Sequence, residues 1–135
     1  MTTATVINAT TLGCSITCRD VEASIKWYRD VIGFAVEQAI EHEGKVVGAV
    51  VGAGQCRIVL SQDDGKLGWD RIKGQGFYLQ ISVAGAADVD AAAARIKAAG
   101  GELISEPEDR AWGERMFQFR DPDGFKLGVS TPLAG

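Results

Sequence analysis

The sequence predicts an α+β fold made of two βαβββ modules in tandem. Residues 16–34 and 81–101 both begin as a short alternating strand, pass through a turn that contains aspartate, and continue as a helix that glycine ends. Three candidate strands follow each helix, and the corners VGAG and DPDG lie at matching places about seventy residues apart. A repeat of this size cannot bury its apolar face alone. We therefore expect one domain over residues 1–135 that contains both modules.

The first module is assigned to residues 10–61. Its helix is predicted from apolar residues at helical spacing and should end at Gly33, because glycine is common just after a helix. Its three later strands are expected at 34–42, 45–51 and 56–61. The apolar helix positions are Val21, Ile25, Trp27, Tyr28 and Ile32.

The second module is assigned to residues 77–131. Its helix carries apolar residues at the same spacing and ends at Gly100 and Gly101. The apolar positions are Val89, Ala93, Ile96 and Ala99, and the strands are expected at 102–108, 114–120 and 125–130.

A linker over residues 62–76 joins the modules and is rich in glycine and charge. Connections longer than about 12–15 residues in a compact domain are usually functional or mobile. Trp69 favours an ordered linker that contacts a cavity or a partner chain, and disorder is the alternative.

The last two predicted strands meet at the turn DPDG, where Asp121 and Asp123 can bind their own backbone and Gly124 can take a positive φ. The outgoing strand then carries Gly128. Glycine inside a strand usually marks a bulge or a close approach to the backbone, so this position needs an explanation.

Composition excludes several classes of protein. The formal charge of −4 and the pI near 4.9 show no excess of basic residues of the kind that favours binding to nucleic acid. No apolar run approaches the roughly 20 residues that span a bilayer, and the threonine-rich start lacks the pattern of a leader, so a cytoplasmic protein without membrane contact is expected. The three cysteines, Cys14, Cys18 and Cys56, are interpreted as buried free thiols.

The chain resembles the vicinal oxygen chelate superfamily, which includes glyoxalase I, extradiol dioxygenases and bleomycin-resistance proteins. The stretches RDVEASIKWYRDVIGF (19–34) and WGERMFQFRDPDGFKLGVS (112–130), together with the tandem repeat, carry this resemblance. It implies the glyoxalase/bleomycin resistance fold, in which curled mixed sheets surround a cavity. It also implies a homodimer, because a second chain often completes that cavity.

Catalytic members of this superfamily hold a divalent metal on cavity-facing strand positions. By the resemblance these positions fall on Gly13, Tyr78, Gly128 and Val59, or on Ile58 if the register shifts. None of them offers an imidazole or a carboxylate, so no metal and no cofactor are expected. The closest likeness is therefore to the metal-free bleomycin-resistance branch, whose WG-x-R segment is matched here by residues 112–115.

Without a metal, a cavity must act through shape, stacking and hydrogen bonds. Trp112 and Arg115 suit a planar or anionic ligand, although a core or interface tryptophan and a surface ion pair are equally open. Met116 replaces a position that is often acidic in the branch, which counts against a cationic ligand. The predicted ligand-binding residues are Ser15, Thr17, Tyr78, Gln80, Trp112, Arg115, Phe117 and Gly128.

Arg115, Phe117 and Phe119 alternate with Glu114, Met116 and Gln118, so one strand face is aromatic and the other is largely polar. The aromatic face either lines the pocket or fills the core. The sequence favours a metal-free protein that sequesters an aromatic or charged small molecule. The alternatives are a glyoxalase-like lyase or isomerase whose metal is lost or relocated, and a dimerisation scaffold with a vestigial cavity.

Overall fold

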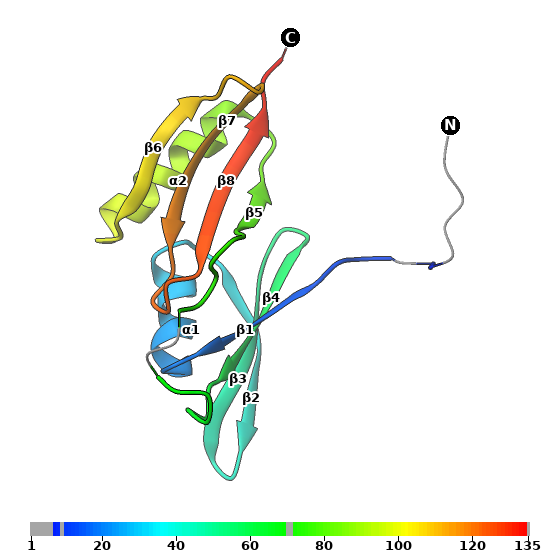
Figure 1. Cartoon of the computed structure of the whole chain (residues 1–135), viewed down its shortest axis with the longest axis vertical. Helices are drawn as coiled ribbons and strands as arrows, with labels where there is room; N and C mark the ends of the chain where they lie inside the picture. Colours follow the sequence, from blue (N-terminus) through cyan, green and yellow to red (C-terminus); the bar gives the residue numbers. More distant parts are fainter. Residues whose placement is uncertain (1–6, 9, 70–71, 135) are drawn as a thin grey trace.

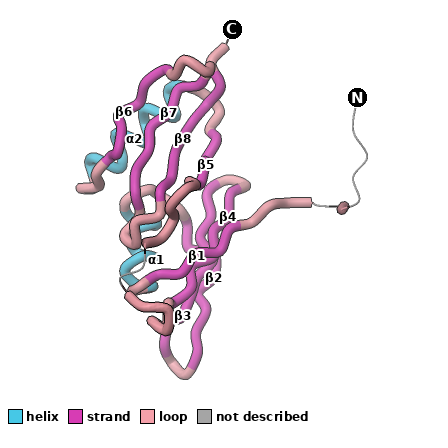
Figure 2. Tube along the Cα trace, in the orientation of Figure 1, coloured by secondary structure: helices cyan, strands magenta, loops and turns pink. Residues whose placement is uncertain are grey.

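The computed structural model describes residues 7–8, 10–69 and 72–134. Two four-stranded mixed sheets lie at opposite ends of the long axis, the second module above the first in Figure 1. Figure 2 shows the same trace by type of structure, with two helices among eight strands. The predicted α+β architecture of tandem βαβββ modules is confirmed, because both sheets have the same strand order.

The first module contains β1 (Cys14–Cys18), α1 (Val21–Asp30), β2 (Ala35–His42), β3 (Lys45–Ala53) and β4 (Cys56–Gln62). The order in its sheet is β1-β4-β3-β2, and β1 runs parallel to β4 while the other pairs are antiparallel. The Asp20 side chain accepts a hydrogen bond from the Ala23 backbone N–H at 3.1 Å, which caps the start of α1. Gly33 takes a φ of 82° just after the helix.

The second module contains β5 (Leu79–Ser82), α2 (Ala86–Ala98), β6 (Leu103–Asp109), β7 (Glu114–Arg120) and β8 (Lys126–Pro132). Its order, β5-β8-β7-β6, repeats that of the first sheet, and α2 covers one face of the sheet (Figure 1). Strands β1 and β5 each lie at one edge of their sheet, so each leaves one backbone side without a sheet partner among the described residues.

The DPDG turn between β7 and β8 has the predicted chemistry. Asp121 accepts hydrogen bonds from the backbone N–H groups of Asp123 and Phe125, both at 2.9 Å, and Gly124 takes a φ of 90°. The Tyr28 hydroxyl on α1 also donates to Asp121 at 2.9 Å. This contact ties the first module to the second.

One continuous apolar core runs through both modules. The rings of Phe117 and Phe119 on β7 stack at 5.7 Å, and Trp27 of α1 reaches Phe119 at 6.1 Å between ring centroids. Helix α1 therefore lies at the junction, where it packs on its own sheet and contacts the second module. Neither helix in the described ranges is long and apolar enough to cross a bilayer.

Candidate functional site

A cavity of about 460 Å³ lies where the two modules meet. It is bordered by the start of β1, the start of β4 and the first three residues of β5, so both modules contribute to its walls. The lining residues are Thr11, Leu12, Gly13, Cys14, Phe34, Gln55, Cys56, Arg57, Ile58, Tyr78, Leu79, Gln80 and Ile81.

The walls of this cavity are mainly apolar and carry little reactive charge. Burial raises the pKa of the half-buried Cys14 thiol, so this group is a weak nucleophile at neutral pH. Arg57 is held by an ion pair with Glu37 at 2.7 Å and by hydrogen bonds to two backbone carbonyls. The cavity therefore suits binding of an apolar or aromatic molecule better than acid–base or nucleophilic chemistry.

Tyr78 explains the glycine at position 128. A Cβ atom on Gly128 would lie 3.1 and 3.3 Å from two ring carbons of Tyr78, and 3.4 Å from the carbonyl oxygen of Phe117. The half-buried Tyr78 ring therefore rests on the bare backbone of β8. Tyr78 lines the cavity, and its hydroxyl makes no hydrogen bond to any other residue that the structure describes.

A short chain of polar contacts begins at Gln80, on the same sheet face as Tyr78. Gln80 donates from its amide to the Ser130 hydroxyl at 2.8 Å and to Glu114 at 3.4 Å. The Trp112 indole N–H donates to the other Glu114 oxygen at 2.7 Å. The exposed indole is thus held beside the face that carries Tyr78 and Gln80.

The structure divides the predicted binding residues into three groups. Tyr78, Gln80 and Gly128 come together at the cavity, and Trp112 joins them through Glu114. Ser15 and Thr17 lie on the first sheet, on the face opposite its helix, and do not line this cavity.

Arg115 and Phe117 form the third group. Both occupy the β7 face that packs on α2, whereas Gln80 and Gly128 occupy the other face. Phe117 is fully buried in the core, and Arg115 pairs with Asp90 at 2.9 Å and Asp109 at 3.0 Å. The two residues therefore lie apart from Tyr78 and Gln80, because the aromatic face of β7 fills the core.

The family model for the "Glyoxalase/Bleomycin resistance protein/Dioxygenase superfamily" matches residues 7–129. The chain belongs to this superfamily. A search of curated proteins gives no match.

Several solved structures share this fold. A glyoxylase/bleomycin resistance protein/dioxygenase domain from Frankia has a TM-score of 0.78 at 23% identity and covers 94% of each chain. TioX from Micromonospora has a TM-score of 0.71 at 21% identity, with 93% of this chain and 100% of TioX covered. A lactoylglutathione lyase from Agrobacterium tumefaciens has a TM-score of 0.68 at 20% identity, with 93% of this chain and 95% of the lyase covered. At these identities the likeness concerns the fold.

The metal that the superfamily implies does not fit the residues present here. Gly13, Val59, Tyr78 and Gly128 supply no ligand, and the Tyr78 ring occupies the space next to Gly128. Within the described ranges, no three His, Cys, Asp or Glu side chains are grouped closely enough to hold an ion. The single histidine, His42, is exposed at the β2–β3 turn beside Glu43.

Sequence reasoning did not identify Glu114 and Ser130 as part of this face. The alternation of Glu114, Met116 and Gln118 along β7 was the available signal, since it placed a carboxylate on the polar face next to Trp112. Nothing in the sequence indicated that Phe34 and Gln55 would line the cavity, because both reach it only through the packing of the modules.

Proposed function

We propose that this protein binds and sequesters an aromatic or charged small molecule without a metal. The observation that carries the proposal is the junction cavity, whose mainly apolar walls include the Tyr78 ring. Its volume lies within the range of about 300–1,000 Å³ that is usual for small-molecule sites.

The polar groups around the cavity favour recognition by hydrogen bonds. The Tyr78 hydroxyl is available, and Gln80 presents a carboxamide. An aromatic body packed on the apolar wall, with a polar substituent near Tyr78, satisfies both kinds of group.

The proposal is tested by fluorescence titration with 8-anilinonaphthalene-1-sulfonate, an aromatic anion. A Gly13→Phe variant should fill the cavity, because a side chain at Gly13 meets open space. We expect saturable binding to the unsubstituted protein. The variant should weaken this binding by about tenfold, which corresponds to a loss of about 1.4 kcal/mol in the free energy of binding. The matched control is Thr10→Phe, an exposed position upstream that does not line the cavity. Equal binding by both variants would refute the cavity as the site.

The alternative activity, a lyase or isomerase of the glyoxalase type with a relocated metal, is separated by metal analysis. Purification without chelators followed by elemental analysis should give no stoichiometric divalent metal. One metal per chain, together with isomerisation of a hemithioacetal, would replace the binding proposal with the enzymatic one.

We propose further that the protein forms a homodimer. Leu12 is fully exposed, and Phe77 and Trp112 are more than half exposed near two strand edges that lack a sheet partner in the described chain. Pairing with a second copy buries such apolar surface and covers the edges. Light scattering at micromolar concentration should give twice the mass of 14.3 kDa, and a monomeric mass would contradict the proposal.

A further inference from the structure

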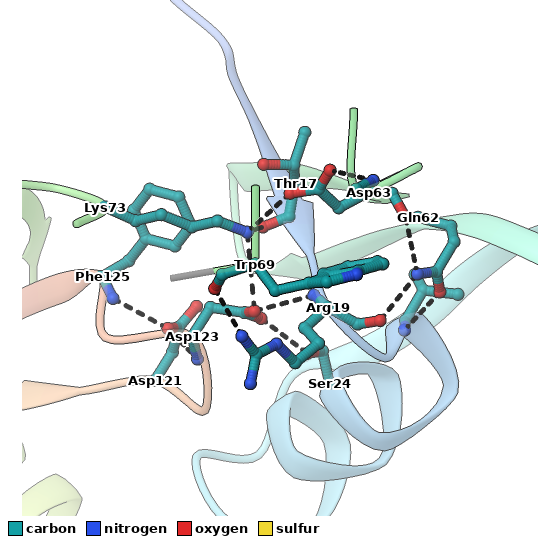
Figure 3. A network of polar contacts seen from close by, with 12 residues as sticks. Thr17, Arg19, Ser24, Gln62, Asp63, Trp69, Lys73, Asp121, Asp123 and Phe125 are labelled. Carbon is teal, nitrogen blue, oxygen red and sulfur yellow. Dashed lines mark hydrogen bonds and ion pairs between the residues drawn. The ribbon is translucent and has the colours of Figure 1, made fainter. Parts of the chain in front are cut away.

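A cluster of buried charges lies on the junction, separate from the cavity. It brings together the end of β1, the N-terminal part of α1, the linker and the β7–β8 turn (Figure 3). Lys73 of the linker and Asp123 of the turn both belong to it. Neither residue was predicted from the sequence to join the modules.

The Lys73 ammonium group contacts three separate pieces of the chain. It lies 3.1 Å from Asp63 after β4, 3.7 Å from Asp123 in the second module, and 3.2 Å from the backbone oxygen of Thr17 in β1. The exposed fractions of the Lys73, Asp63 and Asp123 side chains are only 9%, 4% and 6%. One amine thus connects the linker to both modules.

The two carboxylates also anchor their own surroundings. Asp123 accepts a hydrogen bond from the Arg19 backbone N–H at 2.7 Å and from the Ser24 hydroxyl at 3.2 Å. The Asp63 side chain accepts from the Gly65 backbone N–H at 2.9 Å. Removing the ammonium group would take the Lys73 cation away from two buried carboxylates, and the loss of one partner from a buried ion pair is destabilising.

Several glycines make the linker backbone conformationally flexible, so the contacts of Lys73 are needed to hold it in one conformation. Gly65, Gly68, Gly74 and Gly76 all take positive φ, between 70° and 93°. Gly74 follows Lys73 and packs on Phe125, since a Cβ there would lie 3.0 Å from the ring. Two residues after Gly76 the chain reaches Tyr78 and the cavity wall.

We propose that Lys73 is a latch that holds the linker across the junction and thereby fixes the two modules, and the cavity between them, in one arrangement. When the latch opens, residues 72–76 leave the junction and the end of β1 becomes accessible to solvent, while both sheets and the core that they share stay folded. Lys73 is in this sense a positioning residue, because it sets the place of Tyr78 without lining the cavity.

The reactivity of the Cys18 thiol reports whether the latch is open. It is fully buried at the end of β1, and its backbone oxygen accepts a hydrogen bond from the Asp63 backbone N–H at 2.8 Å. Burial raises the pKa of its thiol to about 11, while nearby Lys73 acts in the opposite direction. With the latch closed, Cys18 should react very slowly with a thiol reagent.

The test measures the reaction of Cys18 with 5,5′-dithiobis(2-nitrobenzoate). A Cys14→Ser/Cys56→Ser background leaves Cys18 as the only thiol. In this background we expect Lys73→Met to raise the reaction rate by about tenfold or more, well below the melting temperature. The matched control is Lys66→Met, because the Lys66–Asp64 pair is long, at 3.8 Å, and its side chains are 83% and 64% exposed. This control should leave the rate unchanged.

A second variant covers the case in which Lys73→Met does not fold. Lys73→Met combined with Asp63→Asn removes one buried charge of each sign and should show the same fast reaction. The free energy of unfolding, measured by urea in each variant, gives the rate expected if Cys18 reacts only from the unfolded chain. A Cys18 rate above that value supports the latch. A rate equal to it, or a rate unchanged by the substitutions, overturns the latch and leaves Lys73 with a purely structural role.

Discussion

Gly128→Ala tests the contact between Tyr78 and β8 most directly. The new methyl group would lie 3.1 and 3.3 Å from the Tyr78 ring carbons, which is too close for an ordinary carbon contact. The ring must therefore shift by a few tenths of an ångström. It can do so because Tyr78 is only half buried and faces the cavity.

Two opposing effects set the change in folding stability. Replacing glycine with alanine stabilises the fold by about 0.4–1 kcal/mol through the lower entropy of the unfolded chain. Overpacking costs about 1–3 kcal/mol where neighbours are rigid, and less where a side chain can swing aside. We expect a net loss of at most about 1 kcal/mol in the free energy of unfolding.

Ligand binding should suffer more, since the displaced ring moves into the space that the ligand uses. We expect Gly128→Ala to weaken binding of 8-anilinonaphthalene-1-sulfonate by about fivefold to tenfold, or about 1–1.4 kcal/mol. The control is Thr10→Ala, a substitution at an exposed position that does not line the cavity. Unchanged affinity in Gly128→Ala would show that the glycine is only a strand irregularity. A further check is Tyr78→Ala, which should abolish the effect of the Gly128 substitution.

Three further outcomes follow from the contacts at the junction and in the core. Tyr28→Phe should cost about 1–3 kcal/mol at pH 7 by urea unfolding, because Asp121 loses a hydrogen bond in a buried place. Burial already raises the pKa of Asp121, and the loss of the hydrogen bond from Tyr28 should raise this pKa further. The folded variant therefore binds the proton more readily than the folded unsubstituted protein does. The stability lost in Tyr28→Phe should thus become smaller as the pH falls through the pKa of Asp121. Phe117→Ala should cost about 3–5 kcal/mol, because the ring is fully buried, and a loss below 1 kcal/mol would contradict its place in the core. Dialysis against EDTA should leave the melting temperature unchanged, and a drop that zinc or nickel reverses would reveal a metal that the donor set does not explain.

The sequence allowed prediction of the modules because local signals repeat. Gly33, the Asp-containing turns and the alternating strands each mark an element without reference to the rest of the chain. The predicted nearness of Gly128 to another group also follows from local reasoning, and the Tyr78 ring supplies that group.

The faces of β7 could not be predicted in the same way. Alternation shows that Arg115 and Phe117 share a face, but it does not say whether that face meets the helix or the cavity. Only the packing of α2, with Asp90 beside Arg115, decides this. The Lys73 cluster could not be predicted from the sequence either, because Lys73 and Asp123 are fifty residues apart and meet only after both modules have folded.

The shared core has a consequence for how the chain folds. Trp27 and Tyr28 belong to the first repeat in sequence, yet part of the surface that they bury is supplied by Phe119 and Asp121 of the second. Neither half can therefore complete its own interior, and unfolding should be a single cooperative transition in which the two halves melt together. Cutting the chain in the linker should yield two fragments that are unstructured alone and regain structure only when they are mixed.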